Sequence, residues 1–320
     1  MKIVVLGGYV VTKTDLSWND FKEFGELVVY DRTNTENEEV ILDRISDADA
    51  ILLNQTKITN NIINRATNLK YIGLLTTGYN TVDIVSAKNK GICVTNIPKY
   101  ATESVAQFTF SLILEVVNQV GKHNKSVHEQ EWTKSIDFTY TKSNLIDLDG
   151  KTLGLIGFGN IAQQVAGIAK AFGMRIIFYN HNKKEYNPSL VQQVDIETIY
   201  KKADIISLHI PQTEETEKII DRRAISLMRP ETILINTARG GLVDEVEVAS
   251  ALNNKDIYYY AADVASIEPI AEDNPLLHSQ NTILTPHIAW QSYEARKKLI
   301  NIALNNLENF IKGDITNQIN

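Results

Sequence analysis

The chain alternates short β-branched runs with polar stretches of helix length, and it does so in two separate series. The first series holds apolar runs at 3–6, 27–30, 50–53, 71–75 and 92–94. Buried parallel strands are near-continuous apolar runs, and spacers of this length between them predict crossover helices. The first hundred residues are therefore expected to form one parallel α/β unit.

A second series begins at residue 152. Its apolar runs lie at 153–156, 175–179, 205–208, 233–235, 258–262 and 282–284. Six strands with helices between them predict a doubly wound sheet. The helical stretch 293–310 follows the last strand and is expected to pack back on the first unit. The prediction is an α/β fold with two doubly wound parallel-sheet domains, one of 1–100 plus 290–320 and the other of 101–289.

Length and composition fit this organisation and exclude several classes of protein. The 320 residues, 43% of them hydrophobic, suffice for about two domains of roughly 150 residues. A net charge of −7 provides no broad cationic surface, so neither nucleic acid nor anionic lipid is expected as a partner. The one cysteine, Cys93, can form neither an intrachain disulfide nor a thiolate metal cluster, which favours a cytoplasmic protein without a metal. The longest apolar stretch, 108–117, is broken by polar residues, and no membrane span is predicted.

The segment 101–120 between the two series is apolar on nearly every face. Ser104 with Gln107 three residues later matches a capping box and predicts the start of a helix. A helix that is apolar all round must be buried on all sides. It is either a central core helix or one buried in part by a second subunit. With the polar arm 121–150, the second alternative predicts a homodimer.

A glycine-rich turn opens the second series. Gly157-Phe158-Gly159-Asn160-Ile161-Ala162 follows a predicted strand and precedes a predicted helix. Gly157 permits the tight turn, and Gly159 lets the backbone approach a diphosphate at the helix N-terminus, beside Asn160 and Ile161. The context predicts a dinucleotide site in a Rossmann domain.

The end of the next strand bears on the choice between NAD and NADP. An acidic residue there would bind the ribose hydroxyls and repel a 2′-phosphate. The position holds Asn180, followed by His181, Lys183 and Lys184. NADP is therefore tolerated or slightly favoured. In the alternative interpretation Asn180 still binds a ribose hydroxyl and the lysines are solvated, so both cofactors stay open.

Three polar residues follow strands of the second series: Arg239, Glu268 and His287. Ligands of open α/β sheets bind at the carboxyl ends of strands, so these residues are expected to converge near the glycine turn. Taken singly, each has a plain interpretation as a surface charge or a structural histidine. Only the set indicates chemistry.

Together these features resemble the D-isomer-specific 2-hydroxyacid dehydrogenases. The resemblance covers nearly the whole chain and includes the segments 76–80, 94–96, 104–106, 157–162 and 209–211 in the order and spacing of the family. The stretch 132–135 and Trp290 resemble the glycerate dehydrogenase or hydroxypyruvate reductase branch. Ala162, Asn180, Ala265 and Ile267 depart from the pattern of many relatives.

The resemblance implies a Rossmann domain inserted in a flavodoxin-like substrate domain, and it implies a role for each site residue. His287 is the general acid, Glu268 holds its ring and stabilises the charged form, and Arg239 binds the substrate carboxylate and keto oxygen. Thr77 and Gly78 would bind the substrate carboxylate through backbone amides. The remaining implied contacts to the cofactor are His209, Pro211, Thr237, Ala238, Asp263 and, again, His287.

The expected function is an NAD(P)H-dependent D-2-hydroxyacid dehydrogenase that works as a reductase of a small 2-keto acid such as hydroxypyruvate or glyoxylate. One alternative is formate or phosphite oxidation on the same scaffold. Another is a nucleotide-sensing regulatory protein, against which the presence of Arg239, Glu268 and His287 together argues. An L-lactate-type dehydrogenase is disfavoured because its glycine turn lies at the N-terminus, whereas here it begins at residue 157.

Overall fold

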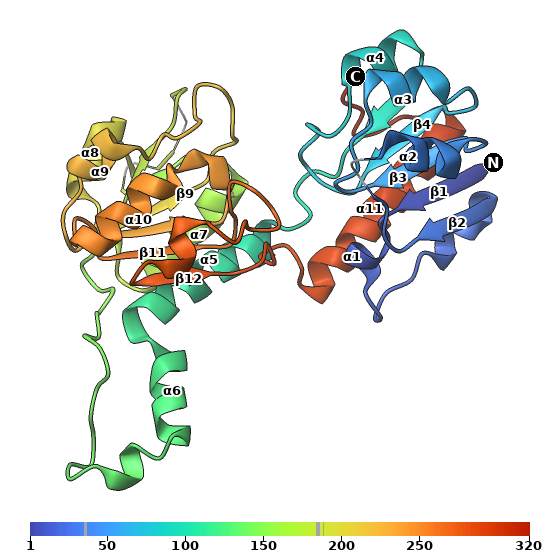
Figure 1. The fold of residues 1–320 in the computed structure, drawn as a ribbon. Coiled ribbons are helices and arrows are strands. Elements are labelled where there is room, and N and C mark those ends of the chain that lie inside the picture. The colour runs from blue at the N-terminus through green and yellow to red at the C-terminus, as the bar shows by residue number, and fades with distance from the viewer. Residues whose placement is uncertain (35–36, 184–185, 188) are drawn as a thin grey trace. The chain divides into compact units, whose positions relative to one another are not determined.

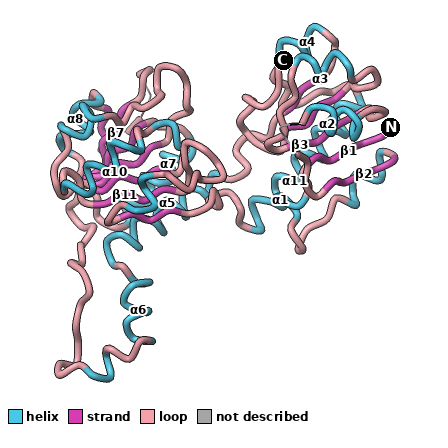
Figure 2. Tube along the Cα trace, in the orientation of Figure 1, coloured by secondary structure: helices cyan, strands magenta, loops and turns pink. Residues whose placement is uncertain are grey.

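The computed structural model describes residues 1–34, 37–183, 186–187 and 189–320. Lys184, one of the cations noted beside Asn180, lies outside the described residues. The chain divides into two compact units, one of Met1–Ala101 with Gln291–Asn320 and one of Thr102–Trp290. In both units the strands form a central layer covered by helices (Figure 2).

The first unit contains a five-stranded parallel sheet in the order β2-β1-β3-β4-β5. This is the order of flavodoxin-like folds. Its strands are β1 (Lys2–Leu6), β2 (Glu26–Tyr30), β3 (Ala50–Leu53), β4 (Tyr71–Leu74) and β5 (Cys93–Thr95). Its helices are α1 (Tyr9–Thr12), η1 (Asn19–Phe24), α2 (Glu38–Ile45), α3 (Asn60–Arg65), α4 (Ile84–Asn89) and α11 (Tyr293–Lys312).

The C-terminal helix α11 completes the core of this first unit. The rings of Phe310 and Tyr71 lie 4.9 Å apart, centroid to centroid, which seats the helix on β4. The buried guanidinium of Arg296 donates to both carboxylate oxygens of Asp15, at 2.7 Å each. Asn306 donates to the backbone oxygen of Asn96 at 3.0 Å. The first unit is thus built from both ends of the chain.

The second unit contains a seven-stranded parallel sheet in the order β12-β11-β10-β9-β6-β7-β8. The order turns back between β6 and β9, the switch point at which doubly wound sheets bind ligands. Its strands are β6 (Thr152–Ile156), β7 (Arg175–Tyr179), β8 (Gln192–Gln193), β9 (Ile205–Leu208), β10 (Ile233–Asn236), β11 (Tyr259–Ala262) and β12 (Thr282–Leu284). Its helices are α5 (Thr102–Asn118), α6 (Val120–His128), η2 (Trp132–Lys134), α7 (Asn160–Ala171), α8 (Ile196–Lys202), α9 (Arg222–Ser226), η3 (Gly240–Leu242), α10 (Glu245–Asn254) and η4 (Pro275–His278). The expected fold class, two parallel sheets with alternating helices, is confirmed.

Two local features differ from the sequence prediction. The helix α5 begins at Thr102, so Ser104 lies inside its first turn, and the Ser104 hydroxyl donates to the backbone oxygen of Ala289 at 2.7 Å instead of capping the helix. The capping-box prediction was therefore wrong. The short strand β8 was not predicted because its two glutamines carry no apolar signal.

The helix α5 packs on the sheet of its own unit but keeps one polar stripe in solvent. Gln107 and Ser111, one turn apart, are exposed, whereas Ala106 and Ile113 are fully buried. Burial on all sides is thus not complete within one chain. The helix α6 and the segment after it extend away from the sheet of the same unit (Figure 1). Within the described residues, none of the helices combines the length and apolar character needed to cross a membrane.

Candidate active site

The glycine turn joins β6 to α7 at the switch point of the sheet in the second unit. Gly157 has a φ of +97°, which residues with a Cβ rarely adopt. A Cβ at this position would lie 2.5 Å from the backbone oxygen of His209, so the close passage of the two loops also requires glycine. The turn therefore brings the loop after β9 beside the N-terminus of α7.

The N-terminus of α7 differs from those of its neighbours. The side chains of Asp195, Asp221 and Asp244 cap α8, α9 and α10. The N-cap residue of α7 is Gly159, and in the part of the chain that is described no side chain caps this helix. A Cβ placed on Gly159 would meet nothing within 4 Å. Free N–H groups and open space at a helix N-terminus suit an anion such as a diphosphate. The residues present thus fit a dinucleotide.

Asn180 follows β7 and is tied to the glycine turn. Its Oδ1 accepts from the backbone N–H of Phe158 at 3.3 Å, and its Nδ2 donates to the backbone oxygen of Asn182 at 2.8 Å. The neighbouring His181 is exposed. The side chain at this position is therefore held in place beside the expected diphosphate and carries no charge.

His209 follows β9, beside Gly157, in the segment that ends at Pro211. Its Nε2 lies 2.9 Å from the Ser207 hydroxyl. Burial lowers the pKa of His209 to about 4. The neutral form of the ring is therefore favoured at physiological pH.

His287 and Glu268 form the direct contact of the site. Nδ1 of His287 lies 2.6 Å from Oε2 of Glu268, and the two side chains are 31% and 29% exposed. Burial alone would raise the pKa of Glu268. The hydrogen bond and charge of His287, with smaller contributions from the Ala265 N–H and the charge of Arg239, outweigh it and hold that pKa below its ordinary value. Glu268 is thus a carboxylate at neutral pH.

The buried carboxylate of Asp263 fixes the loop that carries His287. It accepts from the Thr285 hydroxyl at 2.6 Å and from the backbone N–H groups of Ile288 and Ala289 at 2.9 and 2.7 Å. His287 itself has a φ of +54°, a left-handed conformation that is uncommon for a residue with a side chain. Burial raises the pKa of Asp263, against the effect of these three hydrogen bonds. The loop conformation is therefore specified by long-range bonds as well as by its own sequence.

Arg239 is exposed and lies at the end of a turn held by the fully buried Asn236. Nδ2 of Asn236 donates to the backbone oxygen of Arg239 at 2.8 Å, and its Oδ1 accepts from the N–H of Ala238 at 3.0 Å. The hydroxyl of Thr237 lies 2.8 Å from that of Thr109 on α5. Sequence reasoning missed Asn236, although an amide at the end of an apolar strand is a signal that could have found it.

Thr77 and Gly78 follow β4 in the first unit. The Thr77 hydroxyl donates to the backbone oxygen of Ile97 at 2.7 Å, and Asn96 donates to the backbone oxygen of Thr77 at 2.8 Å. These two bonds use the hydroxyl and the backbone oxygen of Thr77 and do not involve its backbone N–H. The turn is therefore ordered by contacts within its own unit.

Comparison with known proteins agrees with this geometry. Residues 110–289 match the NAD binding domain of the D-isomer specific 2-hydroxyacid dehydrogenases. The chain is 43% identical to a hydroxypyruvate reductase of Blautia hydrogenotrophica over the full length of both proteins. It is 33% identical to a glycerate dehydrogenase of Methylorubrum extorquens, with 99% of this chain and 98% of that protein covered. A solved acyclic imino acid reductase in complex with NADPH and D-Arg superposes with a TM-score of 0.86, at 35% identity and full coverage of both chains.

The match spans more than half of the chain, and the relatives are similar from end to end. An uncapped helix behind a glycine turn, a carboxylate-paired imidazole and an arginine at a strand end are also the parts that a nicotinamide-dependent oxidoreductase needs. The chain is an oxidoreductase that belongs to the D-isomer specific 2-hydroxyacid dehydrogenase family, in the branch of the hydroxypyruvate reductases and glycerate dehydrogenases.

Proposed function

We propose that the protein reduces a small 2-keto acid, such as hydroxypyruvate or glyoxylate, to the D-2-hydroxy acid with NADH or NADPH. The 2.6 Å contact between His287 and Glu268 carries this proposal, because it supplies a proton donor with a fixed orientation. The 43% identical hydroxypyruvate reductase supports the choice of substrate. The lowered pKa of His209 disfavours that ring as the acid, which supports His287 in this role.

The reaction adds a hydride to the keto carbon and a proton to the keto oxygen. The bound nicotinamide supplies the hydride. Nδ1 of His287 faces Glu268, so Nε2 is the ring atom free to donate the proton. Glu268 stabilises the protonated ring before the transfer and fixes its orientation.

Arg239 is proposed to bind the substrate through its planar guanidinium. Two parallel N–H groups match a carboxylate and the adjacent keto oxygen, and the positive charge stabilises the negative charge that develops on that oxygen. Thr77 and Gly78 are proposed to bind the substrate carboxylate through backbone amides. In this assignment the first unit is the substrate domain and the second the cofactor domain.

The cofactor is proposed to lie along the carboxyl ends of the strands in the second unit. The uncapped N-terminus of α7 would bind the diphosphate. Because Asn180 carries no charge, it does not repel a 2′-phosphate, so NADP is tolerated or slightly favoured over NAD. The residues proposed to contact the cofactor are Gly157, Gly159, Asn160, Ile161, Asn180, His181, His209, Pro211, Thr237, Ala238, Asp263 and His287.

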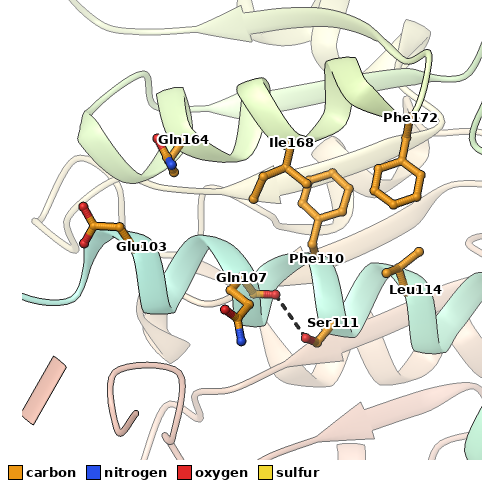
Figure 3. Close-up of a pocket in the computed structure, with 8 residues that line it drawn as sticks. All are labelled: Glu103, Gln107, Phe110, Ser111, Leu114, Gln164, Ile168 and Phe172. Carbon is orange, nitrogen blue, oxygen red and sulfur yellow. Dashed lines mark hydrogen bonds between the residues drawn. The ribbon is translucent and has the colours of Figure 1, made fainter. Parts of the chain in front are cut away.

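A homodimer is proposed through α5 and the arm that follows it. Figure 3 shows a pocket lined by residues of α5 and α7 and by Phe172, among them Phe110, Leu114 and Ile168. The rings of Phe110 and Phe172 are stacked, with their centroids 5.5 Å apart. The arm carries large apolar side chains in solvent, among them Ile136, which is fully exposed. Apolar surface of this kind is usually covered by a partner.

The finding of one cysteine, buried and free, supports a cytoplasmic location.

Light scattering tests the assembly. The purified chain is expected at twice its monomer mass, and Ile136→Ser with Phe138→Ser is expected to weaken the dimer. The same change at Ile267, which is exposed but lies outside the arm, serves as the matched control. A monomeric wild-type chain would contradict the assembly and leave the chemistry untouched.

A substrate screen tests the function itself. We expect loss of absorbance at 340 nm when NADH or NADPH is mixed with the enzyme and hydroxypyruvate or glyoxylate. Arms with formate or phosphite and NAD(P), and with a keto acid plus an amine, test oxidation of one-carbon or phosphorus substrates and reduction of an imine. Turnover only in one of those arms would replace the proposed substrate, and flat traces in all arms would favour the regulatory alternative.

A further inference from the structure

Glu245, the first residue of α10, is buried although it lies in the first turn of a helix. Acidic residues in a first turn usually stand in solvent and interact with the helix dipole. Glu245 as a whole residue is only 9% exposed, and its carboxylate accepts three hydrogen bonds from one loop. The donors are the backbone N–H and the hydroxyl of Ser266, the former at 2.9 Å, and Nδ2 of Asn274 at 2.9 Å.

That loop carries Glu268. Ser266 and Asn274 lie on either side of Glu268 in sequence, so Glu245 binds the loop before and after it. Directly before Ser266, the backbone N–H of Ala265 donates to Oε1 of Glu268 at 3.1 Å. The Glu268 carboxylate is thus held between a backbone donor next to Ser266 and the ring of His287.

The same loop is packed against the segment that carries Arg239. A Cβ on Gly240 would lie 1.9 Å from the carbonyl carbon of Ala265 and 2.3 Å from the nitrogen of Ser266. The backbone after Arg239 therefore touches the very peptide group that Glu245 binds. Five residues further along the chain, Glu245 closes this connection between the two loops.

We propose that Glu245 is a positioning residue for the proton transfer: by holding Ser266 and Asn274 it sets the Glu268 carboxylate against His287. The proposal rests on the proposed role of His287 as the acid. It assigns to Glu245 no contact with substrate or cofactor. It acts on the proton transfer through the position of Glu268.

The site requires a carboxylate because all of its partners donate. The Asn274 amide cannot turn over to offer its oxygen, since Oδ1 of Asn274 already accepts from the N–H of Leu276 at 3.0 Å. A glutamine at 245 would place an N–H₂ group against one of these donors and leave a buried polar group without its bond. Glu245→Gln therefore loosens the loop while it keeps the size of the side chain.

Glu247 provides a matched control in the same helical turn. Its carboxylate accepts from Nε and an Nη of Arg222, at 2.9 and 3.1 Å, and among the described residues it makes no hydrogen bond or ion pair with the loop of Glu268. Glu247→Gln removes the same charge from the same helix end. Any effect of charge or helix dipole alone would appear equally in both variants.

The experiment compares the pH profiles of kcat/KM for keto acid reduction in wild type, Glu245→Gln and Glu247→Gln. For Glu245→Gln we expect kcat to fall on the order of 10-fold to 100-fold, as for other small misplacements of catalytic groups. The midpoint of the high-pH limb is expected to move to lower pH, while the Kd of NADH stays unchanged. Glu247→Gln is expected to match wild type.

Loss of activity in Glu245→Gln with an unmoved pH profile would overturn the proposal, because a merely structural role lowers the amount of active enzyme without changing its titration. If Glu245→Gln does not fold, Ser266→Ala removes one of the three bonds and must shift the profile in the same direction by less. Glu268→Gln is measured alongside. If it fails to move the profile, the proposed function of the pair fails; if it alone moves the profile, only the role of Glu245 fails.

Discussion

At the scale of single residues, the candidate site is held by buried polar side chains that themselves need not touch a substrate. Asn236 binds the turn of Arg239, and Asp263 binds the loop of His287 through three hydrogen bonds. Buried acceptors of this kind are costly to leave unpaired, so each specifies one loop conformation. These contacts preorganise the turn of Arg239 and the loop of His287, the proposed acid.

The pH dependence of reduction tests the pairing of His287 with Glu268. Because the pKa of Glu268 lies below its ordinary value, its charge persists through the neutral range and is lost only as the pH falls through that lowered pKa. A neighbouring negative charge favours the protonated imidazole. Glu268→Gln removes this charge, and the high-pH limb of kcat/KM is therefore expected to move to lower pH, on the order of one pH unit. An unchanged profile would contradict the pairing.

Asp263→Asn tests whether the His287 loop is held from outside. The amide of asparagine places N–H₂ against one of the backbone donors, Ile288 or Ala289, and leaves it without an acceptor. We expect the free energy of unfolding to fall by about 1–3 kcal/mol, as measured by urea denaturation. The kcat is expected to fall as well, because the left-handed conformation of His287 loses its support. Equal stability and kcat in variant and wild type would show that the loop holds itself.

At the scale of elements, the sequence predicted the strands but not the polar contacts between segments remote in sequence. The apolar runs predicted β1 to β7 and β9 to β12 because burial on both faces of a parallel sheet leaves a continuous signal. The predicted start of α5 was wrong because the Ser104 hydroxyl donates to the backbone oxygen of Ala289, which is 185 residues away in sequence. The contacts of Glu245 could not be predicted for the same reason, because only the folded chain brings Ser266 and Asn274 to it.

The end of β7 is an element whose effect on cofactor choice is testable by one substitution. Asn180→Asp keeps the oxygen that accepts from the Phe158 N–H and adds a negative charge where a 2′-phosphate would lie. The ratio of kcat/KM for NADPH to that for NADH is expected to fall about tenfold, the effect of roughly 1.4 kcal/mol of repulsion. The NADH kinetics of the same variant are the internal control. An unchanged ratio would place the 2′-phosphate elsewhere.

At the scale of the whole molecule, the division into two units could be predicted from the order of elements along the chain. The glycine turn at residue 157 follows all five strands of the first unit, and α11 returns to that unit after the last strand of the second. Residues that match a family motif, such as His287 and Glu268, could be assigned as a pair. The bonds that set their distance could not, because they join side chains remote in sequence. The roles of Thr77 and Gly78 stay predictions.

We propose that the imidazole of His287 donates the proton to the substrate, while the glycine turn and the other contact residues supply most of the cofactor binding. The most direct measurement compares wild type with His287→Ala for NAD(P)H oxidation at 340 nm and for NAD(P)H binding by fluorescence. Turnover with a 2-keto acid is expected to fall by about 10²-fold to 10⁴-fold, the range of general acid catalysis, while the Kd of the cofactor stays within a few-fold. Turnover of His287→Ala at the wild-type rate would contradict the role of His287 as the proton donor.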